Sequence, residues 1–296
     1  MTLSDNSRGI LLMCGSMLAF TVNDSFMKAA TQTMPLFQAI ALRGVVATAA
    51  LLVIARLTSG SLSIMPQGPD RWRVALRSLA EIGATATFLT ALTHMPLANL
   101  SAIMQALPLA LTLAAALWLK EPIGWRRLTA ILIGFLGVML IVKPGTGGFT
   151  VWSVLGLISV GCVVVRDLST RTLSRRVPSA AVAVWASVAV MVMGIIVTAI
   201  EGWRPVSGPE AGHLAAASLA LVVGYMLSVM VMRVGDIGLI APFRYTALLW
   251  AILFGWLLFG TLPDGWTVVG AAIVVATGIY TLLRERKLRR RAAVAG

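Results

Sequence analysis

The sequence predicts an all-α membrane protein of ten transmembrane helices, arranged as two inverted five-helix repeats with both termini in the cytoplasm. Three observations predict this class: apolar runs follow one another along the whole chain, the two halves correspond to each other, and basic residues gather in alternate loops. Of the 296 residues, 58% are hydrophobic and 12% are charged, and the mean hydropathy is +0.91. A soluble fold cannot bury that much apolar surface, so lipid is the predicted solvent of this chain.

Each apolar run is close to the roughly 20 residues that cross a hydrocarbon core of about 30 Å. The connections between the runs are short, and many contain a proline, which is typical of turns. The first run could be mistaken for a secretory signal peptide. We predict that it is a retained transmembrane helix, because it carries Asn23, Asp24 and Lys28. The ten predicted segments are 9–29, 36–57, 73–94, 97–119, 125–143, 151–172, 179–200, 213–233, 238–260 and 264–284.

An internal repeat relates the two halves of the chain at an offset of 141 to 143 residues. The matches include Trp125 with Trp266, Gly137 with Gly278, and, near the start of each half, Asp24 with Asp167. We therefore predict a first repeat at 1–144, a second at 145–284 and a basic cytoplasmic tail at 285–296. Because each repeat has an odd number of spans, the repeats are inverted, and such symmetry allows alternating access to a site between them. A duplicated scaffold without transport is the alternative.

The formal charge of +13 follows the predicted topology. Basic residues such as Arg56, Arg71 and Lys120 fall in the predicted inner loops, whereas the outer loops hold chiefly Lys143 and Arg204. This asymmetry predicts that both termini are inside. The tail is predicted either to lie against anionic lipid headgroups or only to fix orientation and solubility. A nucleic-acid partner is not predicted, because the charges form no folded basic domain.

Ionisable residues inside the spans mark function, because a charge in the bilayer needs a partner or a wet cavity. At 1.5 Å per residue, Asp24 and Arg43 are predicted to share an outer depth. Asn23 and Gln105 are predicted to lie at a similar level.

A second layer is predicted near the cytoplasmic side, with Glu81, Arg166, Asp167 and Arg244. We hypothesise that the Asp24 layer helps to close the outside and the Glu81 layer the inside. Static ion pairs that only fix helix packing are the alternative.

Between the layers, aromatic side chains and a hydroxyl could contact a ligand, since pockets combine an apolar lining with a few polar groups. Helix packing or lipid contact is the alternative for each aromatic residue. The candidate substrate-binding or gating residues are Asn23, Asp24, Arg43, Glu81, Thr85, Gln105, Arg166, Asp167, Tyr225, Arg244, Tyr245 and Trp250.

Other chemistry has no support in the sequence. The two cysteines, Cys14 and Cys162, fall in apolar runs, and no HExxH, P-loop, GxSxG or Cys/His cluster occurs. We therefore predict no enzyme activity, no metal and no cofactor. The uniformly apolar segments 125–143 and 264–284 are predicted to be peripheral, where they could form a homodimer contact.

Several motifs resemble the drug/metabolite transporter superfamily, specifically its EamA-type group. They are the runs 94–98, 119–122 and 134–138, the run 241–260, and the residues Asn23-Asp24, Lys28 and Arg43-Gly44. The resemblance covers nearly the whole chain and implies a secondary transporter of the bacterial inner membrane, with a central cavity lined mainly by the first, third, fourth, sixth, eighth and ninth spans. The chain departs from the family pattern at Arg244, where an acidic residue is expected before Tyr245, and at Thr261, where glutamate is usual.

Members of the group export amino acids and other metabolites, and some take up S-adenosylmethionine or riboflavin. The leading expectation is export of amino acids or related zwitterions, because opposed charges in a cavity suit a zwitterion. The alternatives are an uptake carrier for S-adenosylmethionine-like or other cationic or aromatic metabolites, a non-transporting membrane scaffold or sensor, and, with the least support, an intramembrane enzyme.

Overall fold

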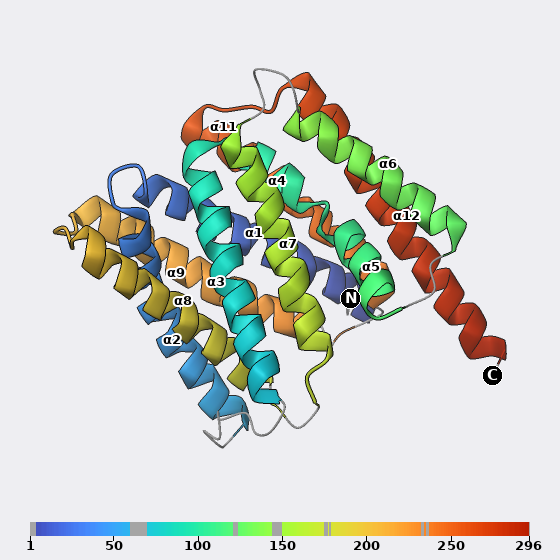
Figure 1. The fold of residues 1–296 in the computed structure, drawn as a ribbon, viewed down its shortest axis with the longest axis horizontal. Coiled ribbons are helices and arrows are strands. Elements are labelled where there is room, and N and C mark those ends of the chain that lie inside the picture. The colour runs from blue at the N-terminus through green and yellow to red at the C-terminus, as the bar shows by residue number, and fades with distance from the viewer. Residues whose placement is uncertain are drawn as a thin grey trace. The chain divides into compact units, whose positions relative to one another are not determined.

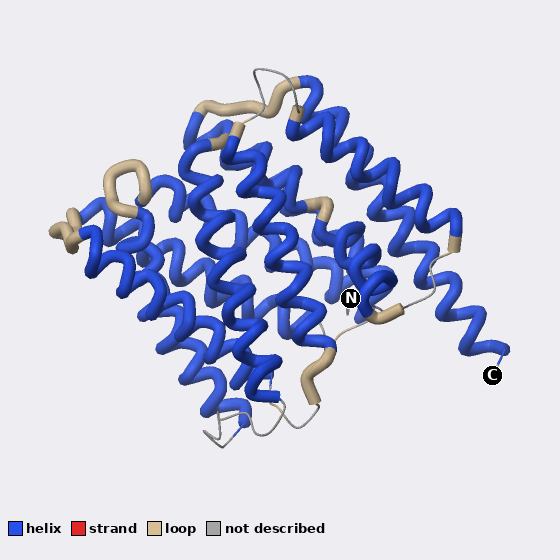
Figure 2. Tube along the Cα trace, in the orientation of Figure 1, coloured by secondary structure: helices blue, strands red, loops and turns tan. Residues whose placement is uncertain are grey.

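A computed structural model of the chain describes residues 4–59, 70–120, 124–143, 150–174, 177, 179–231, 234 and 237–295. Every regular element among these residues is a helix (Figures 1 and 2). Nine helices in the described part of the chain are long and apolar enough to cross a membrane. The tenth predicted span is α3, Asp70–His94, which has 25 residues but is less apolar because it carries Arg77 and Glu81. The prediction of an all-α membrane protein is confirmed.

The helices follow the predicted segments closely. Glu121, Pro122 and Pro144, which support the resemblance and the repeat boundary, lie outside the described residues. In chain order the elements are α1 Asp5–Ala30, α2 Leu36–Ser59, α3 Asp70–His94, α4 Leu97–Met104, α5 Leu107–Trp118, α6 Trp125–Val142, α7 Val151–Arg171, α8 Ser179–Glu201, α9 Gly208–Val231, α10 Ile237–Ile240, the 3-10 helix η1 Ala241–Tyr245, α11 Thr246–Phe259 and α12 Gly265–Ala295.

Two of the predicted spans are interrupted. The segment 97–119 divides into α4 and α5, and the segment 238–260 divides into α10, η1 and α11. A proline follows each break, Pro108 at the start of α5 and Pro242 in η1, and proline lacks the N–H that would continue the helical ladder. Both interruptions are departures from the predicted continuous spans.

The last helix is longer than predicted. We predicted a span that ends at residue 284 and a separate tail, but α12 continues without interruption to Ala295. Its added residues, such as Arg286 and Lys287, are strong helix formers, so helical propensity favours continuation beyond the apolar run.

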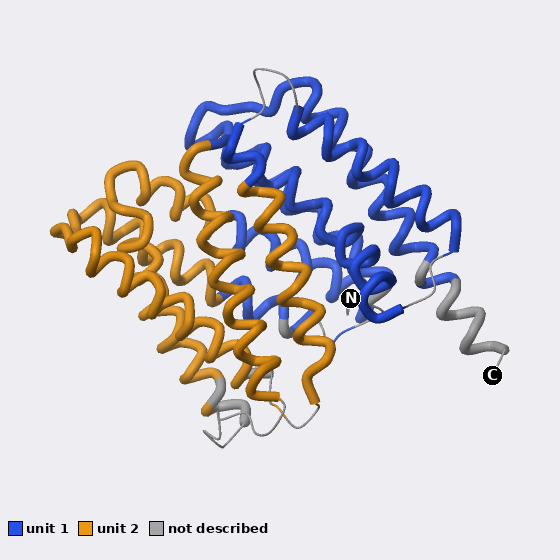
Figure 3. Tube along the Cα trace, in the orientation of Figure 1, with its two compact units in different colours: residues 1–22, 95–154, 223–296 blue, residues 23–94, 155–222 orange. Residues whose placement is uncertain are grey.

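The chain divides into two compact units, drawn in different colours in Figure 3. Unit 1 comprises residues 1–22, 95–154 and 223–296, and unit 2 comprises residues 23–94 and 155–222. Each unit therefore takes helices from both halves of the sequence, and α1 passes from unit 1 to unit 2. The repeat boundaries stay a prediction.

Within unit 1, α6 packs along α12 through glycines. A Cβ on Gly137 would lie 2.8 Å from the Gly270 carbonyl oxygen, and one on Gly270 would lie 2.5 Å from the Gly137 carbonyl oxygen. Small residues allow helix backbones to approach this closely, which gives dispersion contacts over the whole length of the pair. These two helices correspond to the fifth and tenth predicted spans, which are repeat mates.

Within unit 2, α2 packs along α8 in the same manner. A Cβ on Gly44 would lie 2.9 Å from the Met191 Cβ, and one on Gly194 would lie 2.8 Å from the Ala41 backbone nitrogen. The other face of α8 lies against α3. The predicted repeat mates thus pack side by side in each unit. In unit 2 this arrangement supports α3, which carries Glu81.

The ends of α6 and α12 are joined by an ion pair. Lys143 ends α6 in the left-handed conformation, with φ of 54°, and its Nζ donates a hydrogen bond to Asp264 Oδ2. Asp264 Oδ1 also accepts a hydrogen bond of 3.0 Å from the Thr267 backbone N–H at the start of α12. The Asp264 carboxylate therefore caps one helix and holds the end of the other.

This pair predicts a stability loss in acid. The hydrogen bond from Lys143 holds the pKa of the Asp264 carboxyl below its usual value. The stabilisation is thus fully present above an unfolded-state pKa of about 3.9 and is lost as the pH falls through the lower folded-state pKa. We expect the wild-type melting temperature in detergent to fall more steeply below about pH 4 than that of Asp264→Asn. Because the Asp264 side chain is 45% exposed, the difference should shrink in high salt, and equal slopes would contradict it.

Candidate functional site

The first candidate cluster lies in unit 2 and consists of Asn23, Asp24 and Arg43, here called the Asp24 cluster. Asn23 is buried within α1, and Arg43 reaches it from α2. Arg43 Nη1 donates to Asn23 Oδ1 over 3.1 Å, and Asn23 Nδ2 donates to Asp24 Oδ1 over 2.9 Å. Asn23 therefore links the guanidinium to the carboxylate, and the two charges offset each other in a low-dielectric setting. These three predicted residues are brought together.

Lys28, one turn further along α1, binds the end of α3. Its Nζ donates a hydrogen bond to the Leu92 carbonyl oxygen. The last carbonyls of a helix lack intrahelical partners and carry partial negative charge, so a lysine satisfies both needs. The Asp24 cluster is thereby tied to the same helix that carries Glu81.

Two polar side chains hold the loops at this end of unit 2. The Gln38 amide donates to the Arg204 carbonyl oxygen over 2.7 Å and accepts from the Arg204 backbone N–H over 3.1 Å. Glu210 accepts hydrogen bonds from Thr33 Oγ1 and from the Ser207 backbone N–H at the start of α9. Every partner here is a fixed backbone or side-chain group, so these contacts stabilise the fold around the cluster.

The second cluster, here called the Glu81 network, joins α3 to α7 and consists of Arg77, Glu81, Arg166 and Asp167. Glu81 Oε1 lies 3.3 Å from Arg166 Nη1, and Glu81 Oε2 lies 3.6 Å from Arg77 Nη1. Arg166 Nε donates to Asp167 Oδ1 over 2.9 Å. The four side chains are between 15% and 32% exposed. Two cations and two anions therefore balance within one partly buried network.

Arg77 was missed by the sequence analysis. It donates a hydrogen bond of 3.1 Å to Thr170 Oγ1 as well as pairing with Glu81, so it links α3 to α7. The signal was available, because Arg77 stands four residues before Glu81 and residues spaced i, i+4 share one helix face.

Thr85 lies one turn beyond Glu81 on α3, and its side chain is half-buried. On the neighbouring part of α3, Ser159 Oγ of α7 donates a hydrogen bond of 3.2 Å to the Ala84 carbonyl oxygen, and a Cβ on Gly83 would lie 3.0 Å from Cys162 Sγ. The close α3–α7 packing fixes the spacing across which the Glu81 network forms.

The remaining candidates belong to unit 1. Tyr225 and Phe20 pack edge to face, with ring centroids 5.5 Å apart. Ser16 Oγ donates a hydrogen bond of 2.9 Å to the Gly224 carbonyl oxygen beside them. Tyr225 remains 39% exposed, so its outer face is open to a ligand or to lipid.

The interrupted spans hold the other four predicted residues. Gln105 is buried at the end of α4, and Arg244 is exposed in η1. Tyr245 is buried against α12, where a Cβ on Gly278 would overlap its hydroxyl. The Tyr245 hydroxyl and Trp250 Nε1 are both buried and have no hydrogen-bond partner among the described residues. Interrupted helices commonly form transporter binding sites, and unpaired buried polar groups are costly unless a ligand or water satisfies them.

The sequence places Arg244 in one predicted charged layer with Glu81. In the structure these two residues belong to different units. Arg166 and Asp167 lie with Glu81 in unit 2, whereas Arg244 belongs to unit 1. Arg77 is a second cation beside Arg166 in the Glu81 network. Within the described residues, no group of three or more His, Cys, Asp or Glu side chains is placed to hold a metal ion.

Comparison with known proteins bears on this arrangement. The model of the EamA-like transporter family matches residues 7–143, and transporters of the drug/metabolite group align with most of the chain. These matches support the EamA-type group of the drug/metabolite transporter superfamily. The charged clusters and interrupted spans described above are therefore features of a drug/metabolite transporter of the EamA type.

Relatives of this family member are named for different substrates. A pseudopaline exporter of Pseudomonas aeruginosa is 25% identical over 289 residues, which cover 94% of this chain and 97% of that protein. A riboflavin transporter of Vibrio cholerae is 28% identical over 74% of each chain. An S-adenosylmethionine uptake transporter of Rickettsia felis is 24% identical over 73% of each chain. A protein of known crystal structure shares the fold, with 19% identity, a TM-score of 0.63 and coverage of 94% of this chain and 97% of that one.

The comparisons and the apolar helices together indicate where the protein resides in the cell. It is a multi-pass protein of the bacterial inner membrane and a transporter of small molecules, surrounded by lipid.

Proposed function

We propose that the chain is a secondary transporter of small zwitterionic metabolites, most closely amino acids and their relatives, and that it works by alternating access. The observation that carries this proposal is the pair of charge-balanced clusters inside the helices of unit 2. A substrate with separated carboxylate and ammonium groups can exchange partners with such clusters, whereas an apolar substrate could not compensate for the charges it displaced.

The two clusters are proposed to act as gates on opposite sides of the membrane. On α3, Glu81 and Leu92 are separated by about 16 Å along the helix axis at 1.5 Å per residue, and Leu92 receives Lys28 beside the Asp24 cluster. Repeat symmetry pairs Asp24 with Asp167, one in each cluster. Opening one cluster while the other stays paired would expose the substrate to one side at a time.

The direction proposed is export. The relatives include both an exporter and an uptake transporter, so names alone favour neither direction. Uptake of S-adenosylmethionine-like or other cationic or aromatic metabolites is the second candidate, favoured by the Phe20–Tyr225 pair, which could stack on a cation. A non-transporting scaffold or sensor is the contrasting class. We also propose that the basic tail contacts anionic lipids and that α6 and α12 are available for a homodimer contact.

Counterflow in proteoliposomes tests the substrate proposal. Vesicles that contain the purified chain are loaded with one unlabelled amino acid at a time, and uptake of the labelled compound is followed against protein-free vesicles. The proposal expects counterflow for a subset of zwitterions. S-adenosylmethionine and riboflavin are run in parallel.

Three results would contradict the proposal in different ways. Counterflow with S-adenosylmethionine alone would favour the second candidate. If zwitterions inside the vesicles do not change the uptake of label, amino acids and their relatives are excluded as substrates. No flux with any compound, together with a stable protein partner on co-purification, would favour the scaffold or sensor.

A further inference from the structure

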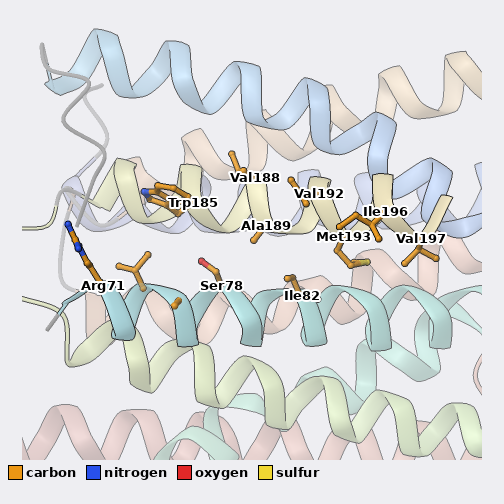
Figure 4. Close-up of a pocket in the computed structure, with 12 residues that line it drawn as sticks. Arg71, Ser78, Ile82, Trp185, Val188, Ala189, Val192, Met193, Ile196 and Val197 are labelled. Atoms are coloured by element: carbon orange, nitrogen blue, oxygen red, sulfur yellow. The ribbon is translucent and has the colours of Figure 1, made fainter. Parts of the chain in front are cut away.

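A groove runs between α3 and α8 on unit 2 (Figure 4), and none of its lining residues belongs to either charged cluster. Its volume is about 770 Å³, within the range of roughly 300–1,000 Å³ typical of ligand pockets. The two helices lie side by side along its whole length. The lining residues are Arg71, Val74, Ala75, Ser78, Ile82, Trp185, Val188, Ala189, Val192, Met193, Ile196 and Val197.

The groove is chemically polarised along its length. Arg71 and Trp185 lie at one end, and Met193, Ile196 and Val197 lie at the other (Figure 4). Between the ends the lining is aliphatic except for Ser78. In the part of the chain that the structure describes, the buried Ser78 Oγ has no hydrogen-bond partner. A ligand with an anionic group at one end and a long apolar chain behind it would match both parts of this lining.

The length of the groove matches one leaflet of a bilayer. From Arg71 to Ile82 α3 rises about 16 Å, and from Trp185 to Val197 α8 rises about 18 Å, at 1.5 Å per residue. Half of a hydrocarbon core of about 30 Å is about 15 Å. Arg71 lies in the first turn of α3, at the end that is predicted to face the cytoplasm, and tryptophan is typical of the headgroup level. The charged end is thus expected where anionic headgroups of the inner leaflet lie.

We propose that this groove binds one anionic glycerophospholipid, with its phosphate at Arg71 and an acyl chain along the α8 face. The exposed apolar side chains of the groove, such as Val192 and Ile196, are 41% and 54% exposed, and the acyl chain would cover them. The site differs from general lipid contact because both a charge and a shaped apolar track are required.

Lipid binding to the delipidated full chain tests the proposal. Native mass spectrometry measures the affinity for dioleoyl phosphatidylglycerol and for dioleoyl phosphatidylcholine. Arg71→Gln is expected to weaken phosphatidylglycerol binding roughly fivefold. The matched control is Arg73→Gln, because Arg73 stands on the same helix end, pairs with Asp70 at 3.2 Å and does not line the groove; its affinity should stay at the wild-type value.

A second pair of variants tests the apolar track. Ala189→Trp fills the groove and is expected to weaken binding of both lipids, whereas Ala199→Trp, at an exposed position of α8 outside the groove, should not. Val192→Trp replaces Ala189→Trp if the latter does not fold, and melting curves without lipid check folding of each variant.

Three outcomes would overturn the proposal. Equal losses of phosphatidylglycerol affinity in Arg71→Gln and Arg73→Gln would mean that surface charge alone attracts the lipid. If a groove-filling variant folds and still binds both lipids as the wild type does, the lipid belongs to the general shell around the protein and does not occupy the groove. Binding of soluble glycerol phosphate as tightly as the whole lipid would mean a phosphate site without an acyl track.

Discussion

Replacing Gly270 with alanine is expected to lower the free energy of unfolding by about 1–3 kcal/mol. The new Cβ would lie 2.5 Å from the Gly137 carbonyl oxygen and 2.8 Å from the Ile141 Cγ1. A backbone oxygen cannot rotate away as a side chain can, so α6 and α12 must separate along their shared length. Alanine favours a helix over glycine by about 1 kcal/mol, which offsets only part of this cost. Denaturant titration in mixed micelles, followed by tryptophan fluorescence, measures the change.

Gly161→Ala provides the matched control. Gly161 lies inside α7 and nothing stands within 4 Å of its added Cβ, so this variant should be as stable as the wild type or more stable, by up to about 1 kcal/mol. A Gly270→Ala protein that unfolds at the same denaturant concentration as the wild type would show that the α6–α12 contact relaxes at no cost.

Glu81→Gln is expected to reduce transport strongly while the folded yield stays near the wild-type value. Glutamine keeps the volume of Glu81 and an acceptor oxygen for Arg166, but it removes the charge that balances Arg77 and Arg166. A hydrogen bond to a charged group contributes about 1.5–3 kcal/mol, so the balance between open and closed states should shift roughly 10- to 100-fold. Counterflow in proteoliposomes and size-exclusion profiles measure the two quantities.

The control for this variant is Glu201→Gln, at an exposed position at the end of α8, which should leave both transport and yield unchanged. Static ion pairing makes a different prediction. If the Glu81 network only fixes packing, the yield of Glu81→Gln should fall and the transport rate per folded molecule should remain.

Much of the fold was predictable because lipid imposes simple rules on sequence. The segment 125–143 became α6, Trp125–Val142, and the segment 151–172 became α7, Val151–Arg171. Residues that were grouped by depth contact one another in two cases: Asn23 links Arg43 to Asp24, and Glu81 pairs with Arg166. Both pairs follow from helix rise and hydropathy alone.

Other features depend on information that hydropathy does not carry. The grouping of helices from both halves into each unit arises from packing between distant segments, which a local window cannot detect. The pairing of Arg77 with Glu81 is carried by their i, i+4 spacing on one helix face and not by hydropathy. The grouping of Arg244 with Glu81 in one layer stays a prediction, since the two residues belong to different units.

The 3-10 helix η1 has a geometric consequence for α11. A 3-10 helix turns about 120° per residue where an α-helix turns about 100°, so five residues of η1 add about 100° of rotation. The side chains of Thr246–Phe259 therefore point about a quarter-turn away from the directions that an uninterrupted helix from Ile237 would give them. A change of Ala241–Tyr245 from a 3-10 helix to an α-helix would rotate the Trp250 side chain about the helix axis by the same quarter-turn. Neither end of the span would have to move sideways.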